Sequence, residues 1–180
     1  MMFEPTPLAG LTIVRAEKRT DDRGYFARLW CDHDFAAADI LFRPRQISTS
    51  FNHVAGTLRG LHWQVGRDSE TKIVRVTSGR VWDVAVDLRP GSKTALRWFG
   101  IELDSAEHTG LLIPSGFAHG YITLTDGAEV TYLIDTPHAP AAARGARYDD
   151  PALGITWPRA PAVVAPRDLA FPPLVVQPCG

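Results

Sequence analysis

The sequence predicts an all-β protein, an antiparallel sandwich or barrel, from two observations. Apolar and polar residues alternate in short runs between turn residues, as in Val81–Leu88, which ends at Arg89-Pro90-Gly91-Ser92. Helical patterns between these runs are scarce, so parallel strands joined by helices are not expected. At 180 residues the chain is long enough to bury a core, and we expect one domain over residues 1–180 with its core at about 45–135.

The expected elements follow one another closely along the chain. Asp32–Asp39 is the one convincing helix, because acidic residues open it. The alternation predicts strands over Thr57–Gln64, Thr71–Val76, Val81–Leu88, Leu96–Leu103, Thr109–Ile113, Gly120–Leu124 and Glu129–Ile134. Half of the 14 prolines lie from Pro151 onward. Because proline disfavours both ladders and helices, we expect an extended tail over about 150–180 that wraps the body.

Composition argues against several classes of partner. The formal net charge of -1, with both signs mixed along the chain, gives no basic surface for nucleic acid. Cys31 and Cys179 lack metal-type spacing and suit a reduced compartment, so no disulfide is expected. Met1–Pro5 is not a secretion signal, and no apolar run reaches membrane-spanning length. We therefore expect a soluble, cytoplasmic protein without nucleic-acid or membrane partners.

Ionisable side chains interrupt the apolar strands. The period of two places Lys72 on the same face as Val74 and Val76, and it places Tyr132 on the same face as Val130 and Ile134. Ionisable groups with perturbed surroundings are concentrated at functional sites. We therefore expect these side chains to point into one cavity.

The segment Thr57–Gln64 sets a cation, a glycine and a histidine inside a strand that otherwise looks buried. In a regular pleat Arg59 and His62 point to opposite faces. Both can line one cavity only if Gly60 allows a bulge or a sharp twist. A second histidine, His119, follows a turn-rich segment and is expected at the same cavity.

Five blocks of the sequence resemble the dTDP-4-dehydrorhamnose 3,5-epimerases and related epimerases of nucleotide-linked 4-keto sugars, a family of the cupin superfamily. They occur in family order, within a similarity that runs from about Arg15 to Pro173, and are Asp22–Arg28, Gly56–Gln64, Thr71–Val76, Ile113–Gly120 and Asp149–Pro158. The resemblance implies a cupin or jelly-roll β-sandwich. It also implies epimerisation at C3 and C5 of a 4-keto-6-deoxyhexose linked to a nucleotide such as dTDP, in deoxysugar supply for dTDP-rhamnose and polysaccharides.

The resemblance also implies catalytic roles. A ketone at C4 acidifies the protons at C3 and C5, so the reaction needs a base, a stabiliser of the enolate and an acid on the other ring face. By resemblance His62 is the base and Asp168 holds its other ring nitrogen. Lys72 stabilises the enolate oxygen, and Tyr132 is the acid.

Substrate binding and assembly follow from the same resemblance. Arginines suit a diphosphate because they form bidentate hydrogen bonds. The residues expected to contact the substrate are Arg23, Phe26, Arg28, Gln46, Ser48, Arg59, His119, His138 and Arg167. In the family, the strand that carries Arg23 and Phe26 is exchanged with a second subunit, so a homodimer is implied.

Two positions depart from the family pattern. His138, in Thr136–Pro140, stands where family members usually carry a tyrosine that stacks on thymine. Ala143, before Arg144-Gly145, stands where the family commonly has glutamate. These departures fit the same reaction on a related nucleotide sugar or a looser pocket for the base.

Plainer interpretations stay open for single residues. His62 alone would be a hydrogen-bonded core histidine, and Tyr132 alone a core or belt residue. Lys72 alone would extend its ammonium from a sheet edge into water, and Asp168 alone would be a solvated charge beside Arg167. Only their combination with the family blocks favours a site.

Alternatives also stay open for the whole chain. An epimerase that acts on one carbon could use the same catalytic residues, and a cupin could bind a sugar nucleotide without converting it. A metal-dependent cupin would explain His119, but His62-Trp63-Gln64 offers too few ligands where cupin metal sites need them. We therefore expect no metal and no organic cofactor.

Overall fold

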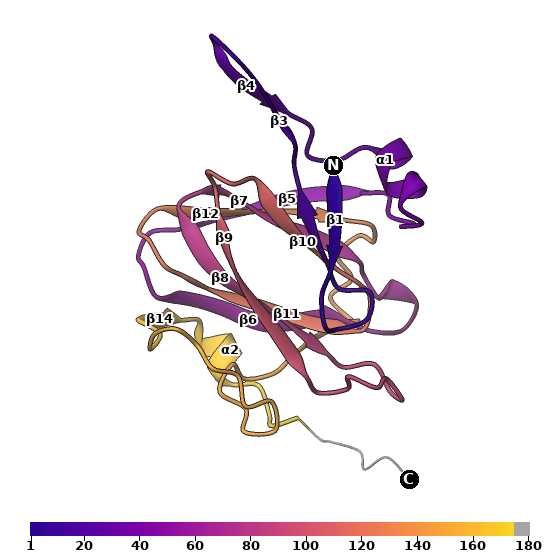
Figure 1. The fold of residues 1–180 in the computed structure, drawn as a ribbon. Coiled ribbons are helices and arrows are strands. Elements are labelled where there is room, and N and C mark those ends of the chain that lie inside the picture. The colour runs from indigo at the N-terminus through magenta and orange to yellow at the C-terminus, as the bar shows by residue number, and fades with distance from the viewer. Residues whose placement is uncertain (175–180) are drawn as a thin grey trace.

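The computed structural model describes residues 1–174 and arranges them as two β-sheets that lie face to face (Figure 1). One sheet has the strand order β1-β2-β10-β7-β12-β5, and the other has the order β13-β6-β11-β8-β9 with β14 beside β6. All pairings are antiparallel except that of β14 with β6. The predicted all-β sandwich is confirmed. Cys179 lies outside the described residues.

The elements have the following bounds. The strands are β1 Met2–Pro5, β2 Thr12–Arg15, β3 Lys18–Asp21, β4 Gly24–Ala27, β5 Gln46–Asn52, β6 Thr57–Gln64, β7 Lys72–Ser78, β8 Arg80–Asp87, β9 Trp98–Asp104, β10 Thr109–Ile113, β11 Phe117–Thr123, β12 Ala128–Ile134, β13 Ala143–Gly145 and β14 Val163–Val164. The helices are α1 Asp32–Ala37, a 3₁₀ turn at Gly66–Asp68, and α2 Pro166–Leu169. None of them, within residues 1–174, is long and apolar enough to cross a membrane.

Side chains from both sheets form the central core. Alternate residues of a strand point to one face, so each sheet contributes one apolar row to the space between them. The buried members of this core include Val74, Val76, Leu111, Val130, Val81, Ala85, Leu103 and Tyr121. Burying an aliphatic side chain of this size stabilises the fold by about 1.5–3 kcal/mol. This core therefore fixes how the two sheets are aligned.

The outer faces of the two sheets are covered by different parts of the chain. Phe35 of α1 packs edge-on against Phe3 of β1, with 4.9 Å between ring centroids, and covers the first sheet. Leu153 and Trp157 pack against Leu61 and its neighbours on the second sheet. Part of the C-terminal segment therefore packs on the outer face of the second sheet.

Two parts of the C-terminal segment are more regular than the prolines suggested. β14 pairs in parallel with the start of β6. The helix α2 begins at Pro166, which occupies its first turn. Proline is tolerated there because its missing N–H has no partner in the helix. Both elements are short, and the proline-rich tail around them is extended.

Most predicted elements are present, with shifted ends. The helix expected at Asp32–Asp39 is α1, and the strand expected at Thr109–Ile113 is β10. The strand expected from Leu96 begins only at Trp98, because Leu96 has a φ of +63° in the preceding turn. The strand expected from Gly120 begins earlier, at Phe117, directly after the turn glycine of the preceding segment.

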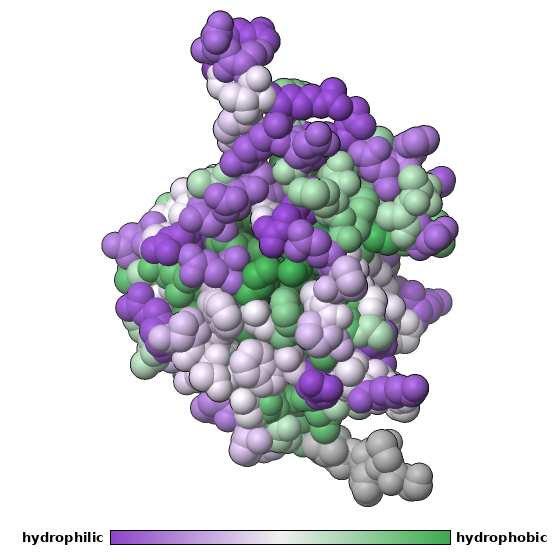
Figure 2. Space-filling view, in the orientation of Figure 1, coloured by the Kyte–Doolittle hydropathy of each residue, from purple (hydrophilic) through white to green (hydrophobic). Residues whose placement is uncertain are grey.

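A hairpin of β3 and β4 projects from the body of the molecule (Figure 1). Figure 2 shows the same projection, with a hydrophilic tip at its far end. Behind this tip, Tyr25 and Phe26 are exposed, with 67% of the Phe26 surface accessible. The hairpin pairs with no other strand of the described residues. Tyr25 contacts His108, with 5.2 Å between the ring centroids, but both outer edges of the hairpin lack a strand partner within residues 1–174.

Candidate active site

A cavity of about 390 Å³ lies between the two sheets. Strands β5, β7 and β12 of one sheet, β6 and β11 of the other, and the start of α2 contribute to its walls. Its lining residues are Gln46, Ser48, Ser50, Arg59, His62, Glu70, Lys72, His119, Tyr121, Tyr132, Ile134, His138, Ala165, Arg167 and Asp168. The four residues predicted to be catalytic and six predicted to bind substrate are therefore brought together. The other three, Arg23, Phe26 and Arg28, do not line it.

The irregularity expected at Gly60 is present. Gly60 has a φ of +130°, and the pairing of β6 with β11 shifts register between His119 and Tyr121. A Cβ atom at Gly60 would lie 2.5 Å from the Cα of Gly120, so only glycine fits. This bulge lets Arg59 and His62 line one cavity although they are three positions apart on one strand.

A buried carboxylate orients His62. Nε2 of His62 lies 2.8 Å from Oδ1 of Asp168, and Oδ2 of Asp168 accepts the backbone N–H of Gly60 at 3.2 Å. Only 1% of Asp168 is exposed. Because an ionised carboxylate can only accept, Nε2 carries the hydrogen and Nδ1 is left as the basic nitrogen. Helix α2 thus carries the aspartate of the C-terminal segment back onto β6.

Burial lowers the pKa of His62 below its ordinary value of 6.5. The hydrogen bond and the charge of Asp168 oppose this effect, whereas the nearby Arg167 and His119 add to it. The imidazole is therefore neutral at pH 7 and can accept a proton.

We expect an Asp168→Asn substitution to lower the pKa of His62 further, because it removes the charge that raises it. Proton NMR titration of the ring measures this value directly. Glu107→Gln, in an exposed turn outside the cavity, is the matched control and leaves the His62 pKa unchanged. A rise in this pKa, or no change, would contradict the coupling of the two side chains.

Lys72 is paired with a carboxylate that the sequence analysis missed. Its Nζ lies 2.5 Å from Oε1 of Glu70, and only 8% of the Lys72 side chain and 11% of the Glu70 side chain are exposed. An ammonium group has three N–H donors, so this pair leaves donors for an acceptor in the cavity. The lysine therefore places a positive charge at the cavity wall.

Tyr132 places a neutral acid in the same cavity. Burial raises its pKa well above 10, and the neighbouring Tyr121 adds to this, whereas a hydrogen bond with Ser50 lowers it. The phenol is therefore protonated at neutral pH. Its ring centroid lies 6.1 Å from that of His119.

Several polar residues that line the cavity or support its side chains from behind were not predicted. Asp83 of β8 holds His119, with 2.8 Å between Oδ2 and Nε2, and both residues are buried. A charged residue in the alternating run Val81–Leu88, on the same face as Val81 and Ala85, was the available signal. Ser50, Asn52 and Tyr121 gave no such signal, because serine, asparagine and tyrosine are common in strands and turns.

A second hollow of about 290 Å³ adjoins the first. It shares His62, Glu70, His138 and Arg167 with the cavity, and it adds Trp63, Gln64, Ala143, Arg144 and Phe171. Both positions that depart from the family pattern, His138 and Ala143, therefore lie in one place, beside the cavity.

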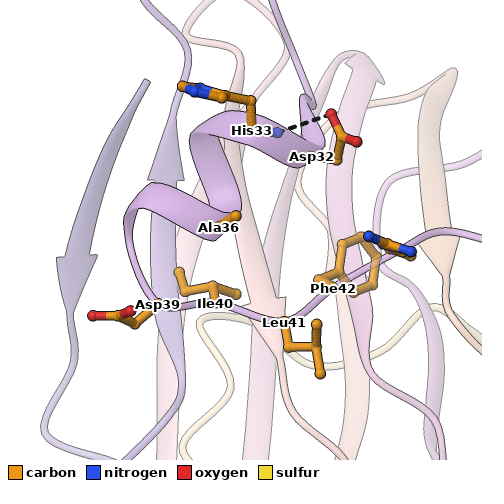
Figure 3. Close-up of a pocket in the computed structure, with 8 residues that line it drawn as sticks. Asp32, His33, Ala36, Asp39, Ile40, Leu41 and Phe42 are labelled. Carbon is orange, nitrogen blue, oxygen red and sulfur yellow. Dashed lines mark hydrogen bonds between the residues drawn. The ribbon is translucent and has the colours of Figure 1, made fainter.

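A further hollow, of about 460 Å³, lies between α1 and the segment that follows it (Figure 3). Its ionisable side chains are Asp32, His33, Asp39 and Arg43. All four are exposed, and 89% of the His33 side chain is accessible. The hollow lacks the buried acid and base of the cavity between the sheets, so we place the chemistry in that cavity.

No group of three or more His, Cys, Asp or Glu side chains within residues 1–174 is arranged to hold a metal ion. The expectation of a metal-free site stays a prediction, which elemental analysis of the purified protein tests.

Comparisons with known proteins give consistent matches. A family model described as dTDP-4-dehydrorhamnose 3,5-epimerase matches residues 5–175. The chain is 36% identical over 179 residues to the dTDP-4-dehydrorhamnose 3,5-epimerase of Sinorhizobium fredii. The aligned region covers 99% of this chain and 92% of the relative. It is 32% identical over 170 residues to the dTDP-4-dehydrorhamnose 3-epimerase of Streptomyces niveus, and the aligned region covers 93% of this chain and 81% of that relative.

A solved structure agrees with these matches. The crystal structure of dTDP-4-dehydrorhamnose 3,5-epimerase from Elizabethkingia anophelis aligns with a TM-score of 0.92 at 32% identity, covering 96% of each chain.

Proposed function

The chain belongs to the dTDP-4-dehydrorhamnose 3,5-epimerase family, and we propose that it performs the family's reaction with His62, Asp168, Lys72 and Tyr132. It is an isomerase with a cupin β-sandwich, and it epimerises a dTDP-linked 4-keto-6-deoxy sugar at C3 and C5. The observation that carries the assignment of residues is the single cavity in which a neutral base, a buried cation and a protonated phenol meet.

His62 removes the proton from the carbon next to the ketone. Nδ1 accepts it, because Nε2–H is committed to Asp168 at 2.8 Å. The imidazolium that forms is stabilised by the buried carboxylate, as in other histidine–aspartate pairs. The electron pair of the broken C–H bond moves to the C4 oxygen and forms an enolate.

Lys72 and Tyr132 complete the step. The ammonium of Lys72 stabilises the negative charge on the C4 oxygen. Tyr132 then donates its phenolic proton to the opposite face of the same carbon, which restores the ketone and leaves a phenolate. His62 ends with one additional proton and Tyr132 with one fewer, so exchange with solvent resets both before the next step.

Arg59 and Arg167 provide cations for the diphosphate, at the cavity wall. We place the nucleotide base near the adjoining hollow, where His138 and Ala143 stand. The cytoplasmic location expected from the sequence stays a prediction.

A homodimer explains two of the three predicted residues that do not line the cavity, whereas Arg28 lies beyond the hairpin and pairs with Asp34 of α1 at 3.5 Å. Arg23 and Phe26 belong to a hairpin that projects from the body (Figure 1), so they can reach a cavity only in another subunit. Ile47 and Phe51 of the edge strand β5 are also exposed, 69% in the case of Ile47. We propose that a second copy covers this edge and receives the hairpin.

Coexpressed inactive variants test the exchange. In mixed dimers of Arg23→Ala and His62→Ala chains, the cavity with an intact His62 receives Arg23 from the other chain. We expect about one quarter of wild-type activity to return, because about half of the dimers are mixed and each has one complete site. His62→Ala with Lys72→Met is the matched control, since both residues line the same cavity and no site is restored. Equal activity of the two mixtures would contradict the exchanged hairpin.

Turnover in deuterated water tests the function. With dTDP-4-keto-6-deoxyglucose, proton NMR should show deuterium and inversion at both C3 and C5. Label at one carbon alone would instead identify a single-carbon epimerase, a function that the name of the Streptomyces niveus relative carries. Label at neither carbon, with retained binding of the nucleotide sugar, would point to a binding cupin.

A further inference from the structure

A continuous chain of polar side chains joins the proposed acid to a proposed phosphate-binding arginine. Tyr132 and Ser50 hydroxyls are 3.4 Å apart, and Ser50 lies 2.7 Å from the hydroxyl of Tyr121. Nδ2 of Asn52 lies 3.2 Å from the Tyr121 hydroxyl, and Oδ1 of Asn52 lies 2.8 Å from Nε of Arg59. Tyr121 and Asn52 are almost fully buried. No water is needed to connect these five side chains.

Two fixed partners orient the amide of Asn52. Nε of Arg59 can only donate, so it requires Oδ1 of Asn52 as its acceptor. The carbonyl oxygen of Ala128 can only accept, and it lies 3.0 Å from Nδ2. The amide therefore cannot be turned over without losing both bonds. In this orientation Nδ2 donates to the hydroxyl oxygen of Tyr121.

The hydrogen bonds keep the same donor-to-acceptor direction from Tyr121 through Ser50 to Tyr132. The hydrogen of Tyr121 has two acceptors in reach, Ser50 Oγ at 2.7 Å and Asn52 Oδ1 at 3.3 Å. Ser50 is the closer one, and Oδ1 already accepts from Arg59. Ser50 Oγ therefore receives this hydrogen and directs its own toward the oxygen of Tyr132.

We propose that Asn52, Tyr121 and Ser50 are positioning residues that keep the phenolic hydrogen of Tyr132 directed into the cavity. Because the oxygen of Tyr132 accepts from Ser50, its own hydrogen is not used within the chain and faces the substrate carbon. When that hydrogen is transferred, the Ser50 hydroxyl donates to the phenolate that remains. The same chain connects the acid to Arg59, so diphosphate binding and the acid share one network. This inference rests on the proposed role of Tyr132.

Neutron diffraction of the intact protein in deuterated water tests the direction without any substrate. We expect the deuterium of Ser50 to point at Tyr132 and that of Tyr121 to point at Ser50. A deuterium of Tyr132 that points at Ser50 would overturn the proposal, because the acid would then be committed within the protein.

A Tyr121→Phe variant tests the consequence for catalysis. It removes one hydroxyl, so Ser50 becomes free to accept from Tyr132. We expect kcat to fall about tenfold, as for loss of one hydrogen bond, with KM little changed. Deuterium exchange at C3 and C5 without inversion should rise relative to epimerisation, because His62 still abstracts protons. A purely structural role would lower both rates together.

Tyr148→Phe is the matched control, since Tyr148 packs on Trp157 and does not line the cavity. It should keep the wild-type ratio of exchange to inversion. A wild-type ratio in Tyr121→Phe would overturn the inference while the activity of the wild-type enzyme still supported the proposed function. An inactive wild-type enzyme would overturn that function, and the neutron result would still decide the direction of the chain.

Discussion

Replacing His62 with alanine is expected to lower kcat about 10³-fold, because no other neutral base in the cavity is placed to take the proton. Of the other two histidines of the cavity, His119 has its Nε2 bonded to Asp83 and is almost fully buried, and His138 lies toward the adjoining hollow. Deuterium exchange at C3 and C5 should be lost together with inversion, since both reactions begin with proton abstraction. Proton NMR of the substrate in deuterated water measures both.

The control for this variant is His33→Ala, which removes an exposed histidine of α1 outside the cavity. It should retain wild-type exchange and inversion. Should His62→Ala exchange either carbon at the wild-type rate, another group would be the base for that carbon, and the assignment of His62 would be wrong there.

Most strands of the two sheets were predictable as short apolar-rich runs between turn residues, although β7, β10 and β11 are buried on both faces. β10 has the predicted bounds, and β7 buries Lys72 with Val74 and Val76, as the period of two requires. Strand β5 was not predicted, because most of its polar residues face the interior and its apolar residues face outward, the reverse of the pattern expected for a core strand. Ser48 and Ser50 point into the cavity while Ile47 faces out. A strand that lines a polar cavity and an exposed edge breaks the usual alternation.

Residues of the site could be predicted where the residue type itself indicates a chemical role. Residues whose role depends on packing across the fold could not. The irregularity at Gly60 followed from the positions of Arg59 and His62 alone, and the positive φ of Gly60 confirms it. The pairing of Glu70 with Lys72 could not be predicted, because Glu70 lies in a connection without periodicity. Burial of Asp168 depends on contacts across the whole chain, so its role came only from resemblance.

The positions at which this chain departs from its family cluster in one hollow. His138 and Ala143 both line the space beside His62, whereas the cavity itself contains all four residues predicted to be catalytic. In the binding mode that we propose, the nucleotide base and the reacting sugar therefore contact different walls. Such a separation allows substitutions that alter nucleotide recognition to leave the acid and the base in place.

Replacing Lys72 with methionine is expected to lower kcat about 10²–10³-fold, the usual cost of removing one charged stabiliser of a developing oxyanion. Methionine keeps the length and apolar packing of the side chain and removes only the ammonium. Because the enolate itself becomes less stable, exchange and inversion should fall in parallel, unlike the uncoupling expected for Tyr121→Phe. Steady-state kinetics combined with exchange in deuterated water distinguishes the two patterns.

Two further variants separate the charge of Lys72 from its surroundings. Lys93→Met removes an exposed lysine and should leave kcat unchanged. Glu70→Gln keeps Lys72 but removes the carboxylate 2.5 Å from its ammonium, so it should lower kcat far less than Lys72→Met does. A Lys72→Met enzyme with wild-type kcat would show that the enolate is stabilised elsewhere, and Arg59 or His119 would then be the group to replace next, because each is a cationic or hydrogen-bonding side chain of the same cavity.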